Sequence, residues 1–346
     1  MSVDMGMGQA YAGLLRRRLG LIVMIALAIV ASFAWDFTTG PAGLAPARLL
    51  ELLLAPLNDA AHLDADRVIV WDIRLPQALM AVLVGAALGL AGAEMQTVLD
   101  NPLASPFTLG LSEAAAFGAA LAIVLGAASG WMVAGAAFGF ALLAALLLDL
   151  VARRLAMNAS GVVLFGIALV FSFNALLWLL QYLASPETLQ AIVFWIMGSL
   201  VRANWPMLGG LAAVLALCLP LALRDAWKLT ALRLGEDRAA SLGIDVARLR
   251  RASLLRVALL AGTAVSCVGT IGFIGLVAPH IARRLCGEDH RFYLPASGLI
   301  GALVLSGAAI SAKQILPGAS LPVGVVTALV GVPFFLAIVL RRGGLS

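Results

Sequence analysis

The sequence predicts an all-α polytopic membrane protein, and three observations support this. Of its 346 residues, 62% are hydrophobic and 12% are charged, and the mean hydropathy is +1.04. A soluble domain could not keep so apolar a surface in water. The apolar runs are continuous rather than alternating, which argues against a transmembrane barrel. The 35 glycines suit close helix packing in lipid, because small residues let backbones approach one another.

The apolar runs predict about ten transmembrane helices in one transmembrane domain covering residues 1–346. Leu19–Trp35 is the first; Ala31–Ala34 resembles a signal-peptide cleavage site, but the length of the run and the later spans favour a retained helix. An extracytoplasmic loop is expected over 36–74, which carries Pro41, Pro46 and Pro56. The other expected spans are 75–99, two within 113–149 that break at Ala128-Ser129-Gly130, 161–183, 206–223, two within 257–282, 295–312 and 322–340, with a partial helix at 188–200.

The charge-free run Val257–Ala282 is long for one span and short for two. A hairpin that turns at 269–275 satisfies the tendency of Lys and Arg to remain in the cytoplasm. Both termini, including residues 1–18, are then cytoplasmic, and so are all but five of the 23 Lys and Arg residues. The five expected outside are Arg48, Arg67, Arg74, Arg202 and Lys313.

Enzyme chemistry has no support in the sequence. There is no phosphate-binding Gly-x-x-x-x-Gly-Lys-Ser/Thr loop, so the chain is not expected to hydrolyse ATP itself. The three histidines and three cysteines are too scattered for a metal site, and no nucleophile–base arrangement is evident. The cysteines and His280 are interpreted as packing residues.

The most distinctive polar stretch is 224–256, which is predicted to be a cytoplasmic loop that binds a partner. Within it, residues 234–244 predict a short helix closed by a glycine. Proline and glycine at four span borders predict loosened helix ends beside a cavity. The eight basic residues of the stretch are Arg224, Lys228, Arg233, Arg238, Arg248, Arg250, Arg251 and Arg256.

Motifs from Arg74 to Leu340 resemble, in order and spacing, the permease family of importers for iron chelates, haem and vitamin B12. The segment from Gly272 to Arg283 resembles the most recognisable part of that family. The other matching motifs are Arg74-Leu75-Pro76, Val84-Gly85-Ala86-Ala87-Leu88, Met95-Gln96, Asn101-Pro102-Leu103-Ala104, Leu109-Gly110, Leu234-Gly235-Glu236 with Ala239 and Leu242-Gly243, Leu321–Thr327 and Gly331–Phe335.

The resemblance implies the permease fold of a type II ABC importer in a bacterial inner membrane. Such a subunit pairs with an identical or related permease, two ATPase subunits that bind ATP and Mg, and an external substrate-binding protein; this chain itself needs no cofactor. The residues implied to couple to the ATPase are Gly235, Glu236, Arg238, Ala239, Leu242 and Gly243.

The resemblance also implies roles at the two ends of the pathway. Arg74 and Lys313 match outer cations that dock the binding protein, although Gln77 stands where a third cation is expected. Asn101 and Leu103 match the cytoplasmic gate, and its partnering residues fall at Ala159 and Ser160. Ala159 replaces a hydroxyl residue at this place.

Two carboxylates, Glu94 and Glu113, depart from the family pattern. Glu94 is a candidate for the translocation path, where it would disfavour an anionic cargo, and either residue could instead serve in pairing or capping. Residues 101–110 resemble ferric-siderophore permeases more than haem or corrinoid ones, which tend to carry Asp/Glu-Pro-Gly there. Haem or vitamin B12 import stays an alternative, as does a proton-coupled secondary transporter with Glu94 as its titratable site.

Overall fold

A computed structural model describes residues 2–40, 43–54, 65–127, 129–155, 157–316 and 320–343. Pro41 and Pro56 of the predicted outer loop and Ala128 of the predicted break lie outside the described residues. The first half of the described chain forms α1 (Ser2–Thr38), α2 (Pro46–Leu54), α3 (Ala65–Val68), the π-helix η2 (Ile69–Arg74), α4 (Leu75–Val98), α5 (Leu111–Val124), α6 (Gly130–Arg154) and α7 (Ala159–Leu183). The second half forms α8 (Pro186–Ile196), the 3-10 helix η3 (Leu200–Arg202), α9 (Trp205–Arg224), α10 (Ala226–Leu232), α11 (Glu236–Ser241), α12 (Val246–Val268), α13 (Ile274–Cys286), α14 (His290–Gln314) and α15 (Val323–Gly343).

The all-helical membrane fold is confirmed. Seven helices of the described chain are long and apolar enough to cross a membrane, and α5 and α15 supply two shorter apolar helices. With α13, which forms the second arm of the predicted hairpin, they make the expected ten. The hairpin turn is confirmed as well, because α12 ends at Val268 and α13 begins at Ile274.

Polar side chains fix several of these helix boundaries. In each case the side-chain oxygen of the residue before the helix accepts a hydrogen bond from a backbone N–H of the first turn. This is why α6, α7, α8, α9 and α12 begin where they do. The capping residues are Ser129, Asn158, Ser185, Asn204 and Asp245.

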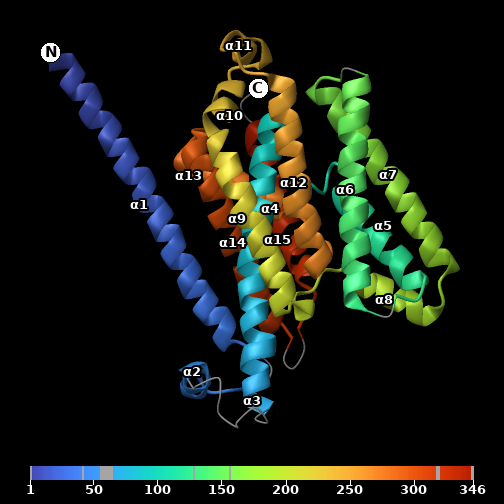
Figure 1. The fold of residues 1–346 in the computed structure, drawn as a ribbon. Helices are drawn as coiled ribbons and strands as arrows, with labels where there is room; N and C mark the ends of the chain where they lie inside the picture. Colours follow the sequence, from blue (N-terminus) through green and yellow to red (C-terminus); the bar gives the residue numbers. More distant parts are fainter. Residues whose placement is uncertain are drawn as a thin grey trace.

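Helix α4 is the centre of the fold. It packs against α9, α12, α13 and α14, and most of its side chains are buried (Figure 1). Its glycines permit this, because a Cβ placed on Gly85 would lie 2.3 Å from the carbonyl oxygen of Gly301, and one on Gly92 would lie 1.9 Å from that of Gly275. The expected close packing through small residues is therefore found at the α4–α14 and α4–α13 contacts.

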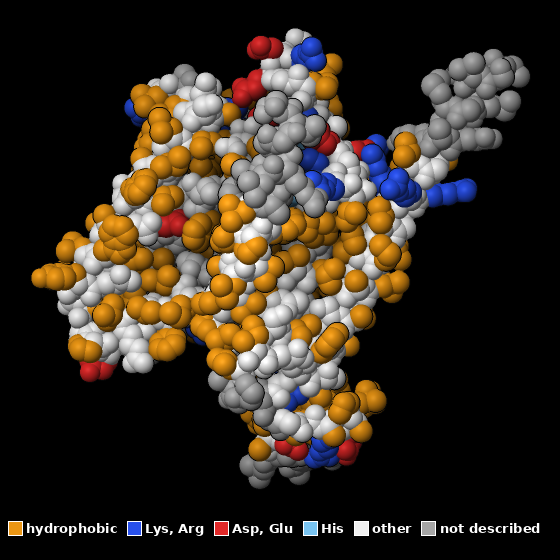
Figure 2. Space-filling model, turned by 180° about the vertical axis from the view of Figure 1, so that it is seen from behind, with side chains coloured by type: hydrophobic (Ala, Val, Ile, Leu, Met, Phe, Trp, Pro, Cys, Tyr) orange, Lys and Arg blue, Asp and Glu red, His pale blue; other side chains and the backbone are white. Residues whose placement is uncertain are grey.

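Helices α5, α6, α7 and α8 form a second group beside this core, joined to it where α5 and α6 pack against α12 (Figure 1). Their outer sides are rich in exposed apolar residues, such as Trp178 and Leu164. Figure 2 shows hydrophobic side chains across the middle of one face of the molecule and charged side chains gathered towards its two ends. This distribution is the one that a lipid bilayer requires.

The bundle has an α11 end and, opposite it, an α2 end. Helix α1 begins and α15 ends at the α11 end, in agreement with the prediction that both termini share one side (Figure 1). The prediction of a loop over 224–256 is corrected. Only 233–235 and 242–245 separate α10, α11 and α12, and the last eleven residues of the stretch form the first turns of α12. Asp245 accepts a hydrogen bond from the backbone N–H of Arg248 and so starts α12 early, before the apolar run begins.

Candidate functional site

The tip of the α11 end is a short helix between two glycines. Gly235 (φ 105°) and Gly243 (φ 79°) adopt backbone conformations that favour glycine, which confirms the predicted helix and its closing glycine. Ala239 is on the buried side of α11. Leu242 is 58% exposed, and Leu234, which precedes the helix, is 56% exposed. The other predicted coupling residues, Gly235, Glu236, Arg238 and Gly243, are exposed. Two exposed leucines among charged residues are suited to a groove on a partner protein.

Arg250 of α12 joins this tip to the end of α4. One guanidinium nitrogen lies 2.5 Å from a carboxylate oxygen of Glu236, and another donates to the Val98 carbonyl oxygen at 3.2 Å. The Arg250 side chain is only 12% exposed. A single side chain thus ties the first residue of α11 to the last residue of α4 by charge-assisted hydrogen bonds.

Arg233 makes a second link, from the segment between α10 and α11. Its guanidinium binds Asp100 at 2.6 Å and Glu288 at 3.1 Å. Asp100 lies directly before the predicted gate residue Asn101, and Glu288 lies between α13 and α14. Arg233 therefore joins the segment before α11 both to the predicted gate loop (residues 99–110, between α4 and α5) and to the α13–α14 connection.

The predicted gate and coupling residues meet around a cavity of about 260 Å³. Ala159 and Ser160 at the start of α7 line it together with Gly235 and Glu236, and Leu99 and Asp100 are also in its wall. Asn101 and Leu103 are not among its lining residues. The Asn101 carboxamide oxygen instead accepts a hydrogen bond from the Leu103 backbone N–H at 2.9 Å, and Leu103 is exposed.

Glu94, a candidate for the path or for pairing, makes an ion pair inside the bundle. Glu94 is fully buried, and both of its oxygens accept hydrogen bonds from Arg256, the shortest at 2.6 Å. Arg256 also binds Asp225 at 3.1 Å, and Lys228 binds the same carboxylate at 2.9 Å. A carboxylate inside a helical bundle is retained only with such partners, and this one links α4 to α12 and, through Arg256, to the α9–α10 junction.

Asp225 lies between α9 and α10, outside the spanning helices. Burial raises its pKa, but the hydrogen bonds and charges of Lys228 and Arg256 outweigh this effect. The pKa of Asp225 is therefore below its ordinary value of 3.8. The carboxylate stays ionised under ordinary conditions.

The two predicted docking cations at the α2 end bind the end of α1 instead of standing exposed. Arg74 is 4% exposed and donates to the carbonyl oxygens of Phe37 and Thr38 at 3.4 and 3.2 Å. Lys313 binds the Asp36 carboxylate at 2.8 Å. A helix C-terminus attracts cations, because its last carbonyl groups are unpaired and its dipole is negative there. In this conformation neither cation is available as an exposed docking group.

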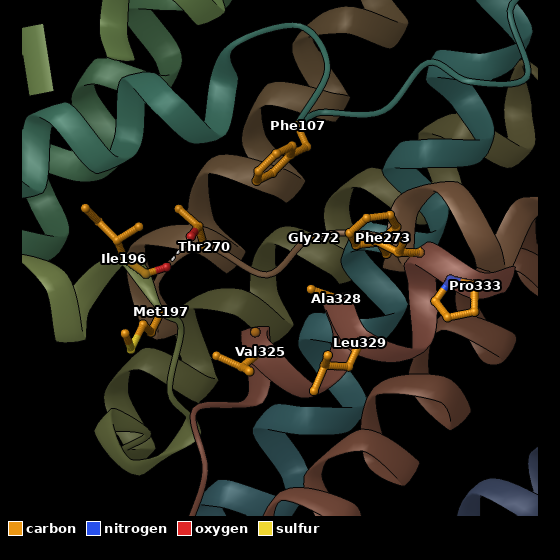
Figure 3. Close-up of a pocket in the computed structure, with 12 residues that line it drawn as sticks. Phe107, Ile196, Met197, Thr270, Gly272, Phe273, Val325, Ala328, Leu329 and Pro333 are labelled. Carbon is orange, nitrogen blue, oxygen red and sulfur yellow. Dashed lines mark hydrogen bonds between the residues drawn. The ribbon is translucent and has the colours of Figure 1, made fainter. Parts of the chain in front are cut away.

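A larger apolar cavity of about 580 Å³ lies where α8, the 269–273 turn and α15 meet (Figure 3). Phe107, Phe273 and Leu329 extend into it, and none of its lining residues is charged. Gly324 and Pro333 belong to the proline and glycine motifs that were predicted to loosen helix ends beside a cavity, and both lie on its wall. Asn101 and Pro102 form another of these motifs, and they do not line the cavity. Among its lining residues, Thr270 carries a hydroxyl group, which donates a hydrogen bond to the Ile196 carbonyl oxygen.

Several other residues singled out in the sequence are in the interior of the bundle. Glu113 of α5 is buried, and its Oε2 has no hydrogen-bond partner in the described part of the chain. His280 packs edge-on against Phe334, with ring centroids 6.3 Å apart. The three cysteines, Cys218, Cys267 and Cys286, are buried and free.

The profile of the FecCD transport family matches residues 24–341, so the chain belongs to that family. It is 40% identical over 281 residues to the vitamin B12 import permease BtuC of Klebsiella pneumoniae, which covers 80% of this chain and 84% of that one. It is 33% identical to the iron(3+)-hydroxamate import permease FhuG of Bacillus subtilis, covering 93% and 97% of the two chains.

Among solved structures, an inward-facing metal-chelate type ABC transporter, described as putative, superposes with a TM-score of 0.82. It is 30% identical and covers 93% of this chain and 99% of the other. The relatives are import permeases and not enzymes. The chain is therefore the permease subunit of an ABC importer.

Sequence reasoning missed the two links to the gate loop. Arg233 and Arg250 were counted among the basic residues of 224–256, but their partners lie 133 and 152 positions away in the chain. Nothing in the local pattern distinguishes them from a solvated arginine. Leu234 was noted only as part of a motif. An apolar residue directly before a short charged helix was the available sign that it could dock a partner.

Proposed function

We propose that this permease carries an iron chelate inward, with a ferric siderophore as its cargo, and that the α11 end faces the cytoplasm. The relatives import vitamin B12, iron(3+)-citrate or iron(3+)-hydroxamates. Residues 101–110 favour the siderophore class within that range, because they lack the Asp/Glu-Pro-Gly of the haem and corrinoid permeases. The uncharged cavity beside α15 is compatible with weak, transient contact with a bulky cargo.

The proposed complex contains a second permease subunit, identical or related, two ATPases at the α11 end, and a binding protein at the α2 end. The single observation that carries the mechanism is the connection of the exposed α11 tip to the gate loop through Arg250 and Arg233. Closure of the ATPases on ATP would displace α11, and these arginines would pass the displacement to the end of α4. The gate at Asn101, Leu103, Ala159 and Ser160 would then open and close with the nucleotide cycle.

The proton-coupled alternative loses its main candidate. A coupling carboxylate must take up and release protons on the path, whereas Glu94 is enclosed by Arg256 and does not face a path in the described structure. We therefore place the driving force in the partner ATPase.

The test is co-reconstitution of the permease with its ATPase and binding protein in liposomes. The double variant Glu236→Arg/Leu242→Asp reverses one charge and places another on the exposed tip. We expect it to abolish assembly or binding-protein-stimulated ATP hydrolysis, while the control Arg154→Gln, at the same end but away from α11, retains both. Unchanged assembly and turnover would contradict the docking assignment, and transport without any ATPase would contradict the class of mechanism.

Cargo is tested by binding and uptake of ferric hydroxamates, ferric catecholates, haem and cobalamin by the same reconstituted complex. Saturable, ATP-dependent uptake of a ferric siderophore is the expected result. Uptake of haem or cobalamin alone would replace the siderophore with the alternative cargo and leave the coupling mechanism intact.

A further inference from the structure

A cavity of about 660 Å³ lies between α9, α10 and α12, on the side of the bundle just below α11. In Figure 1, α10 and the first turns of α12 flank this region. Its lining residues come from the end of α9, from α10, from the 243–245 turn and from the first half of α12. Apart from Gly243 at its margin, the cavity is built from residues outside the set predicted to couple to the ATPase.

The end of the cavity nearest α11 is basic. Arg224, Lys228 and Arg248 line it, and Arg224 and Arg248 are exposed. Two carboxylates also line the cavity, but both have partners: Asp225 binds Lys228 and Arg256, and Asp245 caps α12. Within the described chain, neither the Arg224 nor the Arg248 guanidinium makes an ion pair. Two strong anion-binding groups are thus left without a counter-ion beside one opening.

The other end of the cavity is apolar and reaches into the membrane-spanning part of the bundle. Leu221 of α9 and Leu255 and Leu259 of α12 line it, and all three belong to candidate spans. Leu221 is 40% exposed, so this wall is open at the surface of the bundle. Trp227, 55% exposed, also lines the cavity, and exposed tryptophans are enriched where helices meet the membrane interface.

We infer that this cavity binds an anionic phospholipid. Its phosphate would lie between the Arg224 and Arg248 guanidinium groups, with the Lys228 ammonium nearby, and an acyl chain would lie along Leu221, Leu255 and Leu259. Basic pockets between transmembrane helices at the cytoplasmic boundary are suited to anionic lipid head groups. A cytoplasmic protein could reach the basic end but not the apolar wall, which is why the combination favours a lipid.

The binding is measured by native mass spectrometry of the full permease chain released from nanodiscs of equal parts phosphatidylglycerol and phosphatidylcholine. The wild type is expected to retain phosphatidylglycerol in preference to phosphatidylcholine. The variant Arg224→Gln/Arg248→Gln should weaken that retention by about five-fold for each arginine removed. The matched control Arg154→Gln/Arg284→Gln removes the same charge from exposed arginines at the same end and should retain wild-type selectivity.

Three results would overturn the inference. The first is equal retention of both lipids by the wild type, or equal loss of selectivity in the variant and the control. The second is displacement of the bound lipid by millimolar inorganic phosphate, which would define a site for free anions. The third is a variant that keeps its lipid but no longer co-purifies with the ATPase when the two are co-expressed, which would assign the cavity to a protein interface. Thermal unfolding followed with a thiol-reactive dye on the buried cysteines reports whether each variant is folded.

Discussion

The two ends of the bundle use their basic residues in different ways. At the α11 end, Arg233 and Arg250 connect segments that are far apart in sequence, and the tip that they support stays exposed. At the α2 end, Arg74 and Lys313 hold the end of α1 and are themselves almost fully buried. One end therefore presents an exposed tip that is tied to the end of α4 and to Asp100, whereas the other holds its cations within the subunit. The comparison teaches that charge identifies the end of a membrane protein at which a residue lies, but not its partner.

The largest effect on stability is expected at the buried pair of Glu94 and Arg256, which lies inside the bundle between its two ends. Glu94→Gln leaves a buried guanidinium without its main counter-ion and should destabilise the folded permease by about 3–5 kcal/mol. The thiol-reactive dye reports this as a lowered unfolding midpoint in detergent. The double variant Glu94→Gln/Arg256→Met also removes the unpaired guanidinium charge, while Asp225 retains its ion pair with Lys228. It should therefore recover most of the lost stability. A double variant no more stable than Glu94→Gln would show that the pair does not act through its charges.

A smaller effect is expected at the α2 end, where Asp36→Asn removes the carboxylate that holds Lys313. If Lys313 docks an acidic residue of the binding protein, its release should strengthen binding-protein affinity by up to about five-fold, and the gain should shrink with added salt. Surface plasmon resonance on nanodisc-embedded complex measures this. Lys313→Gln is the paired variant and should weaken binding. If neither variant alters the affinity, Lys313 serves only to hold α1.

The smallest effect is a pH dependence at Asp225. Because its folded pKa is lowered, the carboxylate stabilises the fold above its unfolded value near 3.8 and loses that contribution only as the pH falls through the lower folded pKa. The stability difference between wild type and Asp225→Asn should therefore be constant from pH 8 to pH 5 and narrow only in more acidic solution. A difference that disappears between pH 7 and pH 5 would contradict the lowered pKa.

The course of the helices could be read from the sequence because it depends on local patterns. Apolar run length predicted the spans, and the positive-inside tendency selected the hairpin that separates α12 from α13. A short polar segment closed by a glycine predicted α11. What local patterns miss is the partner of a buried charge. Glu94 could not be placed between a path and a pairing role, because its partner Arg256 is 162 positions away in the chain. Likewise, the sequence could not show that the end of α1 folds against Arg74.

The central claim is that Arg250 transmits movement of α11 to the gate loop, and the direct measurement is cargo transported per ATP hydrolysed in liposomes. Arg250→Gln removes the link to Glu236 and the Val98 carbonyl, whereas the control Arg251→Gln removes a neighbouring arginine that pairs with Asp149 of α6. Because this variant loses charge-assisted hydrogen bonds, we expect the Arg250→Gln complex to assemble and hydrolyse ATP. It should transport about ten-fold less cargo per ATP than the wild type. The control should retain the wild-type ratio. An unchanged ratio in a folded Arg250→Gln complex would contradict the account, because the α11 tip would then move the gate without this arginine.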